Sequence, residues 1–164
     1  MNEVIGDIWE LWEAGEIIAI PTNGIVTNFG KAVMGAGIAK AAVDRFGQVL
    51  ATTLGENINT WGNNVTYLPP HMVSFPTKEH FKDPSSITLI QRSALQLRQF
   101  ATWMLWEKVY IPRVGCGKGR LSWGNVSPVL HDILDDRFTA VHPEHLIDDY
   151  VEPDISEPVK GYEL

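Results

Sequence analysis

The stretch GKAVMGAGIAK, residues 30–40, decides the fold, because it places three glycines within eight residues just before an expected helix. Glycine loses more backbone entropy on folding than any other residue and has no side chain to pack, so such a cluster needs a conformational or steric reason. The following GIAKAAVDRF (37–46) is alanine-rich with apolar residues at helical spacing, and Gly47 marks its end. The preceding GEIIAIPT (15–22) predicts a short buried strand. The stretch is therefore the loop of a strand, loop and helix unit.

A second unit of this kind occurs near the end of the chain. KVYIPRV (108–114) predicts a buried strand, the glycine-rich segment GCGKGRLSWG follows it, and a helix is expected over 125–134 with Pro128 in its first turn. Between the two units we expect a helix or irregular segment over 48–58 and two short strands within 64–77. A long helix follows, capped by Asp83 or Ser85 and running to about Leu105. After the second unit we expect a closing strand over 137–142. Alternating strands and helices predict an α/β domain with a mostly parallel sheet and helices on both faces.

The composition is that of an ordinary soluble globular protein. The chain has 164 residues, 45% hydrophobic and 20% charged, which fits one domain, and no apolar run approaches the roughly 18 residues of a membrane span. The start, MNEVIGDIWELWEAGE, lacks the zones of a signal peptide, so we expect a cytoplasmic protein without a membrane partner. Because Cys116 is the single cysteine, neither an intramolecular disulfide nor a metal site is expected, and no cofactor is indicated.

The net charge of −7 is concentrated at one end of the chain. From residue 143 onward seven acidic residues face only Lys160, whereas residues 1–142 carry 12 basic and 13 acidic side chains. We therefore divide the chain into a domain, 1–142, and an acidic, proline-containing tail, 143–164. The nearly neutral domain has room for a local anion site, but its charge does not indicate sequence-specific nucleic-acid binding.

Both glycine-rich loops are expected at the carboxyl ends of strands. That edge is where open α/β sheets bind ligands, and the helix amino termini there present N–H groups to an anion. Small residues would let the backbone approach phosphate oxygens, so the two loops together predict a diphosphate site. The alternative is that the glycines only allow a helix to pack closely on the sheet. GAGIAK lacks the third glycine of a dinucleotide-binding loop and GCGKGR lacks the GK[ST] of a P-loop, which disfavours hydride transfer and ATP hydrolysis.

Four segments in this order resemble the macro domain, a module that binds ADP-ribose. They are GDI (6–8), IPTNGIVTN (20–28), MGAGIA (34–39) and PRVGCGKGRLSWGNVSPVL (112–130). The last, with MGAGIA, is similar to the branch of terminal ADP-ribose protein glycohydrolase and its phage and bacterial relatives, and also to ADP-ribose 1″-phosphate phosphatases. The resemblance implies a three-layer α/β/α sandwich with a mixed, mostly parallel sheet. It also implies ADP-ribose or an ADP-ribosylated substrate as the partner.

The resemblance implies binding roles for residues in these segments. Asp7 would accept a hydrogen bond from the adenine amino group, with help from the amide of Ile8, and Asp7 is also expected to cap the helix IWELWE. Asn28 matches the asparagine at the distal ribose, with Asn23 as an alternative. Without an activating partner in the sequence, Cys116 is interpreted as a small loop residue. The two diphosphate loops would be formed by Gly35, Ala36, Gly37 and Ile38, and by Arg113, Gly115, Cys116, Gly117, Lys118, Gly119 and Arg120.

The sequence leaves open whether the chain hydrolyses an ADP-ribosyl linkage, hydrolyses ADP-ribose 1″-phosphate or has no catalytic activity. In the glycohydrolase branch an aspartate of the second loop acts as acid and base, and this chain has Gly119 there. The branch also uses a lysine nucleophile, which FPTKEHFKDPSS (75–86) supplies as Lys78. His80 would serve as a general acid or base, and Asp83 would either orient it or form a turn or cap. The catalytic candidates are thus Lys78, Asn28 and His80. An attacking lysine must be neutral and needs a lowered pKa. For the segment around Lys78, the alternative is a loop that only attracts anions. For the whole chain, the alternatives are a non-catalytic binder of ADP-ribose or an NAD metabolite, and an interaction domain with a vestigial cleft.

Overall fold

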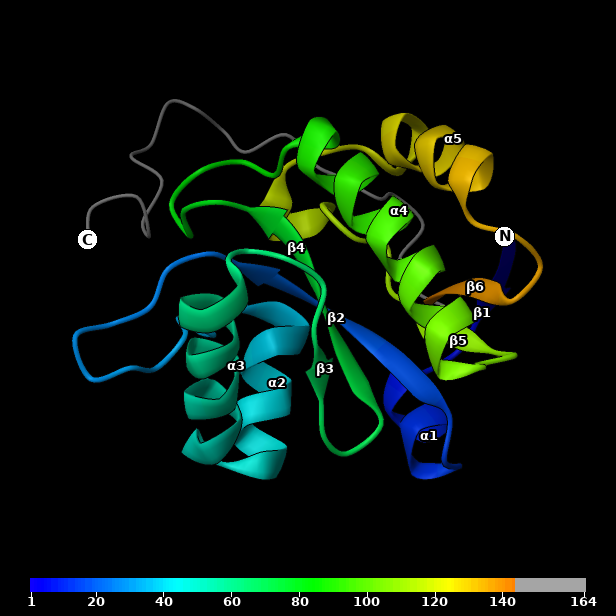
Figure 1. Cartoon of the computed structure of the whole chain (residues 1–164). Coiled ribbons are helices and arrows are strands. Elements are labelled where there is room, and N and C mark those ends of the chain that lie inside the picture. Colours follow the sequence, from blue (N-terminus) through cyan, green and yellow to red (C-terminus); the bar gives the residue numbers. More distant parts are fainter. Residues whose placement is uncertain (144–164) are drawn as a thin grey trace.

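The structure is a computed structural model that describes residues 1–143, so the predicted acidic tail lies outside the described residues from 144 onward (Figure 1). Its centre is a six-stranded sheet in the order β1-β6-β5-β2-β4-β3. All neighbouring strands are parallel except β3, which is antiparallel to β4. The strands are β1 (Asn2–Ile5), β2 (Ile17–Asn23), β3 (Tyr67–Leu68), β4 (Met72–Lys78), β5 (Val109–Ile111) and β6 (Phe138–His142).

Helices cover both faces of the sheet. Figure 1 shows α4 and α5 above it and α1, α2 and α3 below it. Their bounds are α1 (Ile8–Glu13), α2 (Gly37–Phe46), α3 (Gln48–Trp61), α4 (Ile87–Met104) and α5 (Trp123–Ile133), with a short 3-10 turn, η1 (Gly117–Gly119). The predicted α/β/α sandwich with a mixed, mostly parallel sheet is thereby confirmed. No helix in residues 1–143 is long and apolar enough to cross a membrane.

The sheet separates two hydrophobic cores, and the central strand β2 contributes to both. Ala19 belongs to the core under α4 and α5, whereas Ile18 and Ile20 belong to the core under α1, α2 and α3. Side chains of a strand alternate between the faces of its sheet, so a strand covered on both faces is apolar at consecutive positions. This is why residues 17–20, IIAI, are apolar without interruption.

Two helix boundaries differ from the predictions. The predicted helix 37–46 coincides with α2, and Gly47 ends it at a φ of 80°. The amino-terminal cap of α4, however, is Ser86, whose side chain accepts a hydrogen bond from the amide of Leu89, and not Asp83 or Ser85. Helix α5 begins at Trp123, so Pro128 lies in its second turn and not in its first.

Two strands also differ. Strand β5 ends at Ile111 and not at residue 114, because Pro112 has no N–H with which to continue the ladder. Strand β1 was not predicted, and all four of its residues are exposed, so it carries no apolar alternation. It is held by parallel pairing with β6 at the far end of the domain, with Ile5 opposite His142.

The edge of the sheet at β3 is covered by amide side chains of two helices. Asn57 of α3 donates a hydrogen bond to the carbonyl of Tyr67 (3.2 Å). Gln96 of α4 accepts one from the amide of Val65 (3.0 Å). Two backbone polar groups at this edge, the carbonyl of Tyr67 and the amide of Val65, therefore already have partners within the chain.

Candidate functional site

The predicted site residues follow the carboxyl ends of the parallel strands. Loop 1 (24–36) joins β2 to α2, loop 2 (112–122) joins β5 to α5, and loop 3 (79–86) joins β4 to α4. Strand β2 lies between β5 and β4 in the sheet. Because the carboxyl ends of parallel strands meet at one edge, the three loops converge there, at the position where such sheets bind ligands.

The two asparagines that the sequence offers for the ribose, Asn23 and Asn28, lie in different surroundings. Asn28 is exposed in a tight turn, which a hydrogen bond from the amide of Thr27 to the carbonyl of Lys31 (2.8 Å) closes. Asn23 ends β2 and is the register partner of Lys78 on β4. Its side chain donates to the carbonyl of Val33 (2.9 Å) and accepts from the amide of Ile25 (3.0 Å), which fixes both ends of the loop.

The glycines of residues 30–40 serve two different purposes. Gly30 adopts a φ of 79° in the turn, and its carbonyl lies so close to Gly55 of α3 that a Cβ at position 55 would overlap it. Gly35 and Gly37 have no atom within 4 Å of the place where a Cβ would stand. Ala36 precedes α2 and has no side chain that could cap the helix, so no capping side chain covers the N–H groups of the first turn of α2. These N–H groups lie next to the open space. Gly30 and Gly37, the latter with a φ of 58°, both adopt a backbone conformation that favours glycine. Gly35 and Gly37 border open space at the start of α2.

Loop 2 is anchored on the start of α4. A Cβ at Gly115 would lie 2.6 Å from the Cδ1 of Ile90, and a Cβ at Gly119 would overlap the hydroxyl of Ser85. The amide of Ser85 also donates to the carbonyl of Gly119 (2.8 Å). Of the three glycines only Gly117, with a φ of 66°, faces open space. Ser85, which the sequence offered only as a helix cap, therefore limits which side chains loop 2 can contain at position 119.

Lys78 lies at the end of β4, between loops 2 and 3. Its Nζ donates to the carbonyls of Phe81 (3.4 Å) and Lys118 (3.5 Å). Partial burial lowers the pKa of Lys78 below its ordinary value, and the charges of Arg120 and, less strongly, Lys118 lower it further, while Asp83 acts in the opposite direction. Desolvation and cationic neighbours are the two conditions that favour a neutral amine.

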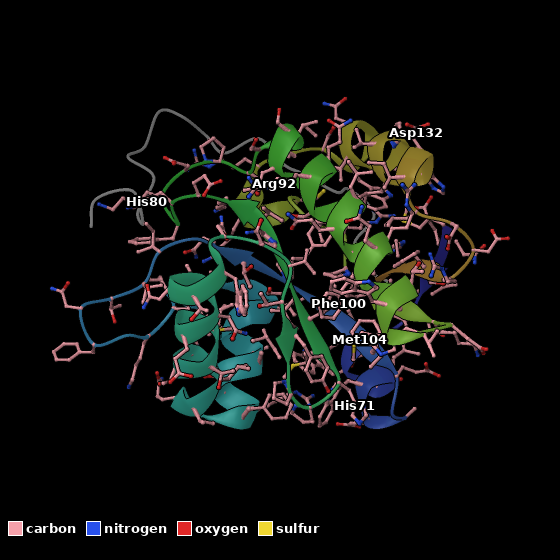
Figure 2. All side chains as sticks on the ribbon, in the orientation of Figure 1. His71, His80, Arg92, Phe100, Met104 and Asp132 are labelled. Carbon is pink, nitrogen blue, oxygen red and sulfur yellow. The ribbon has the colours of Figure 1, made fainter. Side chains whose placement is uncertain are left out.

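His80 lies on loop 3, at the outer side of the domain in Figure 2. Its Nδ1 accepts a hydrogen bond from the amide of Lys82 (3.1 Å), which leaves the proton of the neutral ring on Nε2. The ring stacks on Phe81 with centroids 4.5 Å apart. The loop that carries His80 is thus folded back on itself next to Lys78.

Asp7 and Ile8 follow β1. The predicted cap is confirmed, because Asp7 Oδ1 accepts a hydrogen bond from the amide of Trp9 (2.8 Å) at the start of α1. The carboxylate is exposed, whereas the side chain of Ile8 is buried. The amide of Gly6 donates to the carbonyl of His142 (2.8 Å), which brings the ends of β1 and β6 together.

Cys116 and Arg113 take structural positions in loop 2. Burial raises the pKa of the Cys116 thiol to about 11, so it is protonated at neutral pH. The guanidinium of Arg113 lies over the ring of Trp123, 5.2 Å from its centroid. Trp123 in turn donates from its indole nitrogen to Glu3 (2.7 Å), and these contacts brace loop 2 against α5 and β1.

One hollow on the described surface, of about 580 Å³, lies between loop 1, α2 and α3 and is lined in part by Asn28, Phe29 and Gly35. Another, of about 1050 Å³, lies between α3, β3 and α4 and contains none of the predicted site residues. The smaller hollow therefore adjoins the first glycine-rich loop.

The sandwich and its glycine-rich strand ends define the macrodomain fold. The chain is similar to the macrodomain of Mycobacterium tuberculosis DarG, with a TM-score of 0.65 and 23% identity, covering 87% of this chain and 99% of that one. It is also similar to the macrodomain of Thermus aquaticus DarG (TM-score 0.67, 22% identity, 86% and 96% covered). A third likeness is to Thermosipho africanus DarTG, solved in complex with ADP-ribose (TM-score 0.69, 19% identity, 95% and 44% covered). At these identities the likeness establishes the fold.

A comparison with curated protein sequences finds two relatives, both of them DNA ADP-ribosyl glycohydrolases. The chain is 33% identical over 58 residues to the DNA ADP-ribosyl glycohydrolases of Mycobacterium tuberculosis and Mycobacterium bovis. The match spans 35% of this chain and 16% of those relatives, so it covers a small part of their length. No family model matches the chain.

Proposed function

We propose that the chain is an ADP-ribosyl hydrolase that binds the ADP-ribosyl group across the carboxyl edge of its sheet. The single observation that carries the proposal is Lys78, a half-buried amine whose pKa is lowered by burial and cationic neighbours, at the place where loops 2 and 3 meet. Support comes from solved macrodomains of the same fold, one of them in a protein that was solved with ADP-ribose, and from the DNA ADP-ribosyl glycohydrolase relatives.

The binding roles follow the order of the strands. At the end of β1, Asp7 accepts a hydrogen bond from the adenine amino group, and the amide of Ile8 assists. The diphosphate lies between the two glycine-rich loops. In loop 1 it meets the N–H groups next to Gly35 and Gly37, and in loop 2 it meets the backbone around Gly117 together with the cations Lys118 and Arg120. The distal ribose is then directed toward β2 and β4. Asn28 contacts the distal ribose from the turn of loop 1. Asn23 supports this contact by holding loop 1 in place.

In the proposed reaction the neutral amine of Lys78 attacks the anomeric carbon of the distal ribose. The carbonyls of Phe81 and Lys118 orient Nζ, and Arg120 favours its neutral form. The bond from the anomeric carbon to the linked group breaks, and water releases ADP-ribose from the lysine. The DNA ADP-ribosyl glycohydrolase relatives make ADP-ribosylated DNA the first substrate to test. We also propose that the protein acts in the cytoplasm of a bacterial cell, where a phage-encoded copy would act as well.

A non-catalytic ADP-ribose binder is the second candidate. Loop 2 contains no carboxylate, and Gly119 stands where the resembled glycohydrolases have their acid and base. A protein of this kind would bind ADP-ribose without turnover. Incubation of an ADP-ribosylated DNA oligonucleotide with the wild type and with Lys78→Ala separates the two candidates. Release of ADP-ribose by the wild type alone supports the hydrolase, and binding without release supports the binder.

Binding itself is tested at Gly35, because a side chain there meets no protein atom and its backbone needs no positive φ. We expect wild-type protein to bind ADP-ribose with one site per chain in a calorimetric titration. Gly35→Val should weaken that binding at least tenfold, because the new side chain enters the space left for the diphosphate. Its melting temperature should stay at the wild-type value.

The matched control is Gly124→Val, which makes the same change at an exposed position of α5 where the nearest atom is 3.9 Å away. It should bind ADP-ribose like the wild type. Equal affinity in Gly35→Val and Gly124→Val would show that loop 1 does not hold the diphosphate.

A further inference from the structure

A lysine nucleophile needs a partner that moves protons. The ammonium form of Lys78 has no lone pair, so it must lose a proton before it attacks, and the departing group must gain one. Loop 2, which reaches Lys78 through the carbonyl of Lys118, contains neither aspartate nor glutamate. A carboxylate side chain at Gly119 would have to displace the hydroxyl of Ser85. The proton carrier must therefore come from another element.

Loop 3 brings one carboxylate to this position. The loop turns back over Lys78, whose Nζ bonds the carbonyl of Phe81 (3.4 Å), and the amide of Asp83 closes the turn on the carbonyl of His80 (3.0 Å). Asp83 is exposed, and α4 takes its cap from Ser86. The side chain of Asp83 is thus not needed to start the helix.

The charges around Lys78 single out the same residue. Within residues 1–143 the ionised groups that act on Lys78 are Arg120 and Lys118 of loop 2 and Asp83 of loop 3. Asp83 is the one acid among them. Glu79, although next to Lys78 in the chain, instead accepts a hydrogen bond from Asn63 and lies 3.8 Å from Arg92.

We propose that Asp83 is the proton carrier that serves Lys78, an inference that rests on the proposed hydrolase function. The carboxylate takes a proton from the ammonium of Lys78. The neutral amine then forms a bond to the anomeric carbon while the bond from that carbon to the leaving group breaks, and the leaving group takes the proton from Asp83. In the second half, water attacks the anomeric carbon, the carbon–nitrogen bond breaks with its electron pair returning to Nζ, and Asp83 accepts the proton of the water.

The test measures single-turnover release of ADP-ribose from an ADP-ribosylated DNA oligonucleotide between pH 5 and pH 9, alongside ADP-ribose affinity. We expect Asp83→Asn to bind ADP-ribose within about twofold of the wild type and to release it at least ~100-fold more slowly. Its rate should still fall toward low pH, because Lys78 has to lose a proton in either protein, but it should stay below the wild-type rate across the whole range. Asp83→Glu should recover part of the rate.

Glu79→Gln is the matched control, since it removes an acid of the same loop that does not act on Lys78, and it should react at the wild-type rate. A rate for Asp83→Asn within threefold of Glu79→Gln would overturn the proposal. So would a comparable loss of ADP-ribose affinity, which indicates a structural role for loop 3. Release that is about 100-fold slower in His80→Gln but normal in Asp83→Asn would also overturn it. Wild-type protein that binds ADP-ribose without releasing it would overturn both this inference and the hydrolase. Absence of wild-type binding would instead remove the proposed site.

Discussion

At the scale of single residues, the sequence showed which side chains lie at the site but not what each one does there. Gly30, Gly35 and Gly37 look alike in the sequence, yet Gly30 and Gly37 adopt a positive φ and Gly35 does not. The carbonyl of Gly30 also packs against Gly55. The lowered pKa of Lys78 depends on burial and on the charges of Arg120 and Lys118, which are 40 or more residues away along the chain. The contact of Ser85 with Gly119 likewise joins residues far apart in the sequence.

The lowered pKa of Lys78 has a consequence for stability. In the folded protein the charged form is disfavoured relative to the unfolded chain, where the pKa keeps its ordinary value of 10.5. The cost is therefore present at neutral pH and disappears as the pH rises through the folded pKa toward that value. Lys78→Met should raise the melting temperature at pH 7 by about 2 °C, and the gain should shrink near pH 10.

Circular dichroism melting at both pH values checks this expectation. Lys40→Met is the control, because Lys40 pairs with Asp44 on the surface and is well exposed. Its melting temperature should not rise. If Lys78→Met melts at or below the wild-type temperature at pH 7, burial of Lys78 does not cost folding free energy.

At the scale of elements, local signals placed α2 within its observed bounds, because an alanine-rich repeat and a terminal glycine define it. Strand β1, which depends on a distant partner, was missed, and so were two boundaries that have local causes. Strand β1 exists through its pairing with β6, and β5 is cut short by Pro112. Helix α5 starts early because Ser122 accepts a hydrogen bond from the amide of Asn125.

The contact between α3 and loop 1 predicts a strict requirement for glycine at position 55. A Cβ there would overlap the carbonyl of Gly30, a backbone atom that moves only with the whole turn. Gly55→Ala should lower the free energy of unfolding by about 2 kcal/mol, despite the better helix propensity of alanine. It should also weaken ADP-ribose binding, because loop 1 would shift.

Urea denaturation compares this variant with Gly124→Ala, the same change at an open position of α5. Gly124→Ala should be unchanged or slightly more stable. If the two variants unfold at the same urea concentration, α3 and loop 1 are not in the close contact described.

At the scale of the whole molecule, the order of strands and helices sufficed to predict the sandwich, because alternating elements favour few topologies. The convergence of loops at one edge also followed, since it is a property of parallel sheets. The sequence did not show that loop 3 would fold over Lys78. That arrangement depends on contacts among Ser85, Gly119 and Lys118, which only the assembled sheet brings together.

Both hydrophobic cores and the whole sheet lie within residues 1–143. A chain that ends at residue 143 should therefore fold cooperatively and melt within about 2 °C of the full chain. Calorimetric melting of the two chains side by side checks this division into domain and tail. A drop of more than about 5 °C would show that the acidic tail contributes to the fold.

The amide side chains along β3 also determine how the protein behaves at high concentration. An edge strand with unpaired backbone groups is where a second molecule adds its own strand and aggregation begins. At this edge Asn57 and Gln96 already occupy the carbonyl of Tyr67 and the amide of Val65. A neighbouring molecule would have to break both hydrogen bonds before it could extend the sheet, so the protein is protected against edge-to-edge aggregation on this side.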